Sequence, residues 1–157
     1  MVIKLEKKDS IYFLTMDAEE NRWNTTFVRE IAEALDEIEN DEGPGALITS
    51  STNPKFFSNG LDLDWMQAPE DYPEGGDREV FGEEFMYLMG RVITLPIPTV
   101  CAINGHAFGA GFMFALSHDT RIMREDRGFL CAMNATWFTN PRPELALSNT
   151  KYCKCFF

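Results

Sequence analysis

Short apolar segments alternate with amphipathic segments along most of the chain, and glycine-containing turns connect the two kinds. Residues 46–50 and 99–104 are short, apolar runs, typical of buried strands. Each run is followed by a segment with helical periodicity, and a strand–helix–strand order brings successive strands together in parallel. The alternation therefore predicts a layered α/β fold with largely parallel strand pairing.

The remaining elements follow from the same periodicities. Residues 2–6 and 10–16 predict a β-hairpin. Asn24 or Thr25 can cap a helix that runs to about residue 40. The segment 62–84 is acidic and contains prolines and glycines, as a solvated loop does. The other expected elements are helices at 61–66, from Phe81 to about Val92 and at 109–117, and a strand at 120–124.

Composition narrows the classes of partner. The 157-residue chain has a net charge of −11, so we expect no nucleic-acid partner. No apolar run reaches membrane-spanning length and no signal peptide precedes the first strand, so we expect no membrane insertion. The four cysteines form no C-x-x-C pair and lack zinc spacing, so we expect free thiols and no metal.

Two glycine turns carry the candidate chemistry. In residues 57–63 a strand enters, Gly60 permits a sharp turn and a helix is expected at once. Residues 103–111 repeat that order. The N–H groups of Leu61 and Ala110 would then lie at helix starts, without a partner inside the helix. Two outward donors of this kind can bind an oxygen that gains negative charge.

The segments FFSNGLDL and INGHAFGAGFMFALSHD resemble the two signature stretches of the crotonase (enoyl-CoA hydratase/isomerase) superfamily. The INGHAFGAGFMFALSHD segment is most similar to the plant-type peroxisomal Δ3,Δ2-enoyl-CoA isomerases. The resemblance covers roughly residues 2–131. It implies a spiral of ββα units, a CoA-thioester substrate in fatty-acid β-oxidation, and a trimer. Coenzyme A is then part of the substrate, so no separate cofactor is expected.

The resemblance also implies the roles of particular residues. Leu61 and Ala110 would donate their backbone N–H groups to the thioester oxygen. The CoA portion would bind near the Arg22–Trp23–Asn24 turn and beside Ser58. The implied substrate-binding residues are Trp23, Asn24, Ser58, Gly60, Asp62 and Gly109. The resemblance implies a peroxisomal location, although the terminal Cys-Phe-Phe is not a signal of the S-K-L type, and the cytoplasm is the alternative.

The base that such an enzyme needs is missing from its two expected places. The first hydratase glutamate would fall at Met113, which disfavours hydration. The glutamate that isomerases keep would fall at Asn134, or at Ala135 after a one-residue slip, and neither is a base. Three carboxylates elsewhere are considered as substitutes. Asp64 and Glu70 could reach over the pocket, and Glu144 could swing in, although nothing in its flanks fixes its position.

Residues 132–157 differ in character from the preceding chain. All 11 glycines lie at or before Gly128, and the apolar residues of this tail follow no clean period. We therefore divide the chain into a crotonase-like core domain, 1–131, and a divergent tail, 132–157, with the spiral incomplete at its C-terminus. We hypothesise a shortened product of alternative splicing, whose exposed apolar surface favours oligomers or poor solubility.

Three functions remain open. The first is an acyl-CoA enzyme of the enoyl-CoA isomerase type. The second is a non-catalytic family member that binds acyl-CoA or associates with full-length subunits. A third, another enolate chemistry such as thioester hydrolysis, needs a polar residue that the sequence does not place.

We expect several other polar and aromatic residues to have structural rather than catalytic roles. We expect His106 to make a local hydrogen bond, although it could act as an acid. His118-Asp119 is interpreted as a helix end and turn, and Asp62 as a helix cap. The aromatic residues near the turns are expected in the core or in the wall of an acyl pocket: Trp23, Phe56, Phe57, Phe108 and Phe112.

Overall fold

A computed structural model describes residues 1–69, 75–125 and 131–132. Its main layer is a five-stranded sheet in the order β1-β2-β4-β7-β9. The first two strands pair antiparallel as the predicted hairpin, and every later pair in this sheet is parallel. The bounds are β1 Ile3–Lys8, β2 Ile11–Met16, β4 Ala46–Ser51, β7 Thr99–Ile103 and β9 Thr120–Met123.

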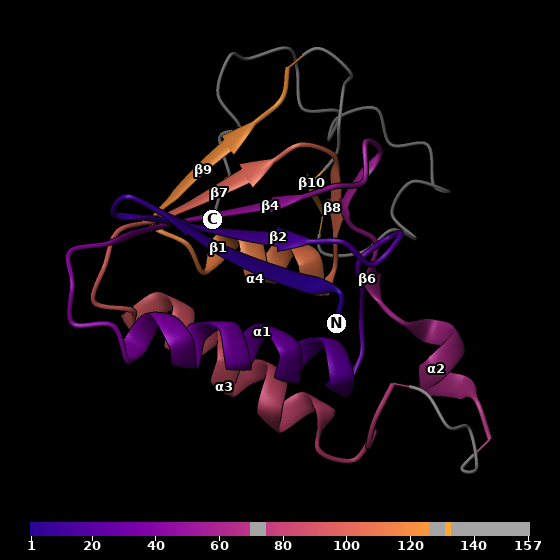
Figure 1. Ribbon diagram of the computed structural model, residues 1–157. Coiled ribbons are helices and arrows are strands. Elements are labelled where there is room, and N and C mark those ends of the chain that lie inside the picture. Colours follow the sequence, from indigo (N-terminus) through magenta and orange to yellow (C-terminus); the bar gives the residue numbers. More distant parts are fainter. Residues whose placement is uncertain (70–74, 126–130, 133–157) are drawn as a thin grey trace.

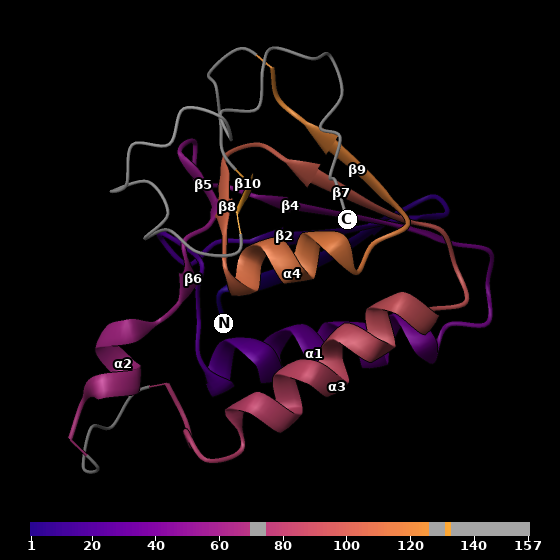
Figure 2. The same ribbon diagram turned by 180° about the vertical axis from the view of Figure 1, so that it is seen from behind.

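The longer helices lie together on one side of this sheet, as both views show (Figures 1 and 2). They are α1 (Thr25–Glu39), α3 (Phe81–Thr94) and α4 (Ala110–Leu116). Asn24 caps α1, and its side chain accepts a hydrogen bond from the N–H of Phe27 at 2.9 Å. None of the helices in the described residues is long and apolar enough to cross a membrane.

Trp23 lies at the centre of the core between the helices and the first glycine turn. Its side chain is fully buried, and three rings contact it edge to face at centroid distances of 5.0–5.1 Å: Phe27, Phe85 and Phe114. These three residues come from α1, α3 and α4. Burying large aromatic surfaces at one point joins three helices that are far apart in the sequence.

Short strands hold the two turns. One small sheet has the order β10-β8-β5, with β5 at Phe56–Ser58, β8 at His106–Phe108 and β10 at Cys131–Ala132. The other pairs β3 (Arg22–Trp23) with β6 (Gly60–Leu61) in parallel. The predicted domain boundary after residue 131 falls within β10, and the tail 133–157 lies outside the described residues.

The predicted helix at 61–66 was wrong at its start. Residues Gly60–Leu61 form a strand, Asp62 is the N-cap, and α2 runs over Leu63–Gln67. Pairing with β3 keeps the chain extended through Leu61, because Trp23 offers backbone partners there. The N–H of Leu61 is therefore not at a helix N-terminus, and the helix-dipole argument does not apply to it.

Candidate active site

The first glycine turn is anchored on both sides of Leu61. The N–H of Asp62 donates to the carbonyl oxygen of Trp23 at 2.9 Å. The N–H of Gly60 donates to Ser58 Oγ at 3.2 Å. Successive N–H groups of an extended chain point in opposite directions. The N–H of Leu61 consequently points to the edge of β6 that faces away from β3.

The second turn also leaves one backbone N–H, that of Ala110, without an acceptor in its own element, but for a different reason. Gly109 precedes α4 with φ 47° and ψ −115°, a conformation that disfavours a side chain. The N–H of Met113 donates to the carbonyl oxygen of Gly109 at 3.0 Å, which begins the helix. Ala110 is the first residue of α4, so its N–H has no acceptor within the helix. This placement matches the prediction for Ala110.

The two turns lie in direct contact. A Cβ at position 60 would lie 2.9 Å from the carbonyl oxygen of Phe108 and 3.8 Å from the Cα of Gly109. A Cβ at position 111 would lie 2.3 Å from the Cβ of Ser58. Only glycine allows such approach of two backbones. The segments that carry Leu61 and Ala110, 49 positions apart in the sequence, therefore meet in space.

The implied substrate-binding residues divide into three groups. Trp23 and Ser58 are fully buried and bonded to each other, with Trp23 Nε1 donating to Ser58 Oγ at 3.0 Å. Asn24 and Asp62 lie nearer the surface, where each caps a helix and Asn24 Nδ2 donates to Asp62 Oδ2 at 3.4 Å. Gly60 and Gly109 form the contact between the turns. Substrate binding by any of these residues stays a prediction.

Asn21 is a supporting residue that the sequence analysis missed. Its side chain is fully buried at a φ of 51°, and it accepts a hydrogen bond from the N–H of Ala18. Its Nδ2 donates to Ser51 Oγ at 2.7 Å and to the carbonyl oxygen of Phe57 at 3.0 Å. Asn tolerates this left-handed conformation better than most residues, and an Asn between two charged segments was the signal available.

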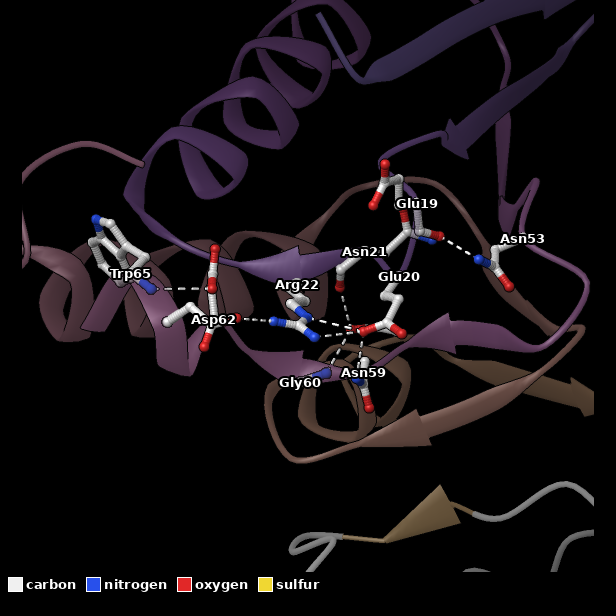
Figure 3. Close-up of polar contacts among 11 residues, drawn as sticks. Glu19, Glu20, Asn21, Arg22, Asn53, Asn59, Gly60, Asp62 and Trp65 are labelled. Atoms are coloured by element: carbon white, nitrogen blue, oxygen red, sulfur yellow. Dashed lines mark hydrogen bonds and ion pairs between the residues drawn. The ribbon is translucent and has the colours of Figure 1, made fainter. Parts of the chain in front are cut away.

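A polar chain runs along the outer side of the first turn (Figure 3). Glu20 Oε2 accepts from Arg22 Nε at 2.9 Å and from Asn59 Nδ2 at 2.7 Å, and Arg22 also pairs with Asp64 at 2.7 Å. The bond from Asn59, more than the pair with Arg22, lowers the pKa of Glu20. Arg22 thus contacts Asp64, whose side chain is largely exposed.

Only some of the positions considered for a catalytic base lie within the described residues. Met113 packs against the core at the position where hydratases carry a glutamate. Asn134, Ala135, Glu70 and Glu144 lie outside the described residues. Among the described residues, no group of three or more His, Cys, Asp or Glu side chains could hold a metal ion.

The two histidines take structural positions. His118 is buried between α4 and β4, with Nδ1 2.8 Å from the carbonyl oxygen of Phe114 and Nε2 2.9 Å from Thr49 Oγ1. Burial lowers its pKa to about 4, so the ring is neutral. His106 lies in β8 and stacks on Phe108 at 5.5 Å, and burial, with a smaller effect of Lys55, lowers its pKa.

Solved structures share this arrangement of sheet, helices and turns. A putative enoyl-CoA hydratase/isomerase (crotonase) from Legionella pneumophila matches with a TM-score of 0.69 at 26% identity, over 83% of this chain and 49% of that one. Enoyl-CoA hydratase EchA3 from Mycobacterium ulcerans matches with a TM-score of 0.69 at 27% identity, over 80% of this chain and 53% of that one. The fold is therefore of the crotonase class, as predicted.

Comparison of the sequence with known proteins assigns the chain to one family within that class. The family model for enoyl-CoA hydratase/isomerase matches residues 6–136, and the chain belongs to this family. Enoyl-CoA delta isomerase 2, peroxisomal, from Arabidopsis thaliana is 36% identical over 128 residues, and enoyl-CoA delta isomerase 3 from the same plant is 35% identical over 129. Each match covers 80% of this chain and 53% of the relative, so the chain spans about half the length of these relatives.

Proposed function

We propose that this protein binds an acyl-CoA thioester and polarises its carbonyl oxygen with the N–H groups of Leu61 and Ala110. The observation that carries the proposal is the contact of Gly60 with Phe108 and Gly109, which brings the two turns together. The N–H directions described above leave both groups available beside that contact. Kinship with delta isomerases supports a role of the isomerase type in fatty-acid β-oxidation.

Two backbone donors suit this chemistry for an energetic reason. Removal of a proton next to a thioester carbonyl leaves an enolate, whose oxygen carries most of the new charge. Fixed donors stabilise that charge without reorganisation, and losing one typically costs about 3–4 kcal/mol in the barrier. Coenzyme A enters as part of the substrate, near Asn24 and Asp62 at the rim, and no separate cofactor is proposed.

A second candidate function rests on the two expected glutamate positions, which hold Met113 and Asn134, or Ala135 after a one-residue slip, so that neither supplies a base. Met113 is apolar and packs against the core. A family member without a base would still bind and polarise an acyl-CoA, or associate with full-length subunits, but would not move the proton.

One pair of measurements separates the candidates. Titration calorimetry with octanoyl-CoA measures binding, and an assay with a 3-enoyl-CoA measures isomerisation by the same preparation. Binding together with turnover supports the isomerase. Binding without turnover supports the non-catalytic member, and a flat titration contradicts acyl-CoA binding altogether.

The location and assembly are proposed from kinship alone. Two of the Arabidopsis relatives are named as peroxisomal, which supports a peroxisomal site of action. We propose a homotrimer, or association with full-length subunits, and exposed apolar side chains on α3 (Met86, Tyr87 and Ile93) are consistent with association. Light scattering tests this directly, and a clean monomer would contradict self-assembly.

A further inference from the structure

The hydroxyl of Ser58 lies at the point where the two turns meet. The residue is fully buried, and its Oγ takes part in three hydrogen bonds. It donates to the carbonyl oxygen of Asn21 at 2.7 Å, and it accepts from Trp23 Nε1 at 3.0 Å and from the N–H of Gly60 at 3.2 Å. A hydroxyl has one donor and two acceptor sites, so these bonds use its full capacity.

The bond from Gly60 holds the Asn59–Gly60 peptide group, which directly precedes the peptide group that carries the Leu61 N–H. The N–H of Gly60 is directed to Ser58 Oγ, while the N–H of Asp62 is directed to the carbonyl oxygen of Trp23. Gly60 has a φ of 86°, a conformation that glycine adopts readily and that other residues rarely adopt. Ser58 therefore supplies one of two anchors that aim the N–H between them, that of Leu61.

The same residue sets the spacing to the second turn. The Cα of Gly111 lies so close to Ser58 that an added Cβ would be 2.3 Å from Ser58 Cβ and 2.4 Å from Oγ. Gly111 is the residue after Ala110 in the first turn of α4. The Ser58 side chain is thus the surface against which the start of α4 rests.

We propose that Ser58 is a positioning residue: it directs the N–H of Leu61 through Gly60 and sets the distance to Ala110 through Gly111, without touching the substrate. This inference rests on the proposed function, because it assumes that both N–H groups meet one thioester oxygen. It gives Ser58 a different role from the substrate contact that the family resemblance implies. A displacement of about 1 Å in a positioned group can cost about 10²-fold in rate, so such a residue matters without any contact of its own.

The test uses the full chain with cinnamoyl-CoA, whose absorbance moves to longer wavelength when its thioester carbonyl is polarised. Ser58→Ala removes the hydroxyl but keeps the Cβ that faces Gly111, so it isolates the link to Leu61. The control is Thr49→Val, which also deletes one buried hydroxyl, that bonded to His118. Thr49 is equally buried but lies in β4, outside the turns.

The readout is the spectral shift of the bound ligand at saturation, which is independent of affinity. We expect Ser58→Ala to lose roughly half of the wild-type red shift, because one of two donors is turned away. Thr49→Val is expected to keep the full shift despite a similar loss of thermal stability. An unchanged shift in Ser58→Ala would overturn the positioning role while leaving the proposed function intact. Absence of any shift in the wild type would overturn both.

A measurement on the wild-type chain covers the case in which Ser58→Ala does not fold. Amide hydrogen exchange followed by NMR should show a protected Gly60 amide and a fast Leu61 amide. Octanoyl-CoA should then slow the exchange of Leu61. A Gly60 amide that exchanges as fast as the Leu61 amide would show that Ser58 does not hold this peptide group.

Discussion

Gly60 lies against the carbonyl oxygen of Phe108, so that a methyl group at position 60 would be 2.9 Å from that oxygen. This contact joins β6 to the end of β8, two elements that no hydrogen-bonded ladder connects directly among the described strands. It brings together two turns that are distant in the sequence, as the proposed function requires.

The first prediction concerns Gly60→Ala. The new Cβ has to push against Phe108, and a φ of 86° is strained for alanine, so the turns should move apart. Octanoyl-CoA should bind roughly tenfold more weakly, as expected for the loss of one hydrogen bond of about 1–1.5 kcal/mol. Calorimetry measures the change.

Gly82→Ala is the matched control. Gly82 lies in α3 with open space around its Cα, so alanine should raise stability by up to about 1 kcal/mol and leave binding unchanged. If the two variants weakened binding equally, the contact at Gly60 would have no special role.

The second prediction concerns the packing of Gly111. Gly111→Ala places a methyl group inside the van der Waals radius of Ser58, and overpacking of this kind costs about 1–3 kcal/mol. Gly90→Ala, with nothing close to its Cα, should instead be neutral or stabilising. Urea denaturation gives both values, and a Gly111→Ala chain as stable as the wild type would contradict the close approach.

The third prediction follows from Asn21. Asn21→Ala loses the bonds to Ser51 and Phe57 and places alanine at a φ of 51°, so it should destabilise by about 2–4 kcal/mol. Asn21→Gly loses the same bonds but relieves the backbone strain, so it should be more stable than the alanine variant by about 1 kcal/mol. Equal stabilities in thermal unfolding would exclude the backbone contribution.

The fourth prediction is a pH dependence of stability from His118. Burial lowers the pKa of the folded ring to about 4 from an ordinary 6.5, so the unfolded chain binds a proton first as pH falls. The stabilisation is fully present above pH 6.5 and is lost as pH falls toward 4, by up to about 3 kcal/mol.

The comparison variant for this prediction is His118→Gln, measured by chemical denaturation between pH 7 and about 5. It should show a flatter pH dependence than the wild type. The remaining slope would include His106, whose pKa is also lowered. Identical slopes in the two chains would contradict a neutral, buried His118.

The sequence predicted the elements with strong periodicity. The helix that Asn24 caps and the strands of the main sheet have enough residues for their apolar patterns to be read locally. The strands β3, β6 and β8 have two or three residues each, and tertiary pairing rather than local preference defines them. For that reason the helix expected at Leu61 was wrong at its start.

The positions of the two turns were predictable from the sequence, but the hydrogen bonds that hold them were not. Gly60 and Gly109 marked both turns, because glycine is the residue that permits positive φ and close backbone approach. The orientation of the Leu61 N–H depends instead on Ser58, Asn21 and Trp23, whose hydrogen bonds join segments more than 30 positions apart. No local pattern in the sequence reports such bonds.

Isotope-edited infrared spectroscopy shows whether Leu61 and Ala110 polarise a bound thioester carbonyl. Octanoyl-CoA labelled with ¹³C at the thioester carbon is bound to saturation by the wild-type chain and by Gly60→Ala. We expect a carbonyl band at lower wavenumber than in free octanoyl-CoA, with a smaller displacement in Gly60→Ala. A carbonyl band that stays at its free position in the saturated wild-type complex would contradict polarisation by these two N–H groups.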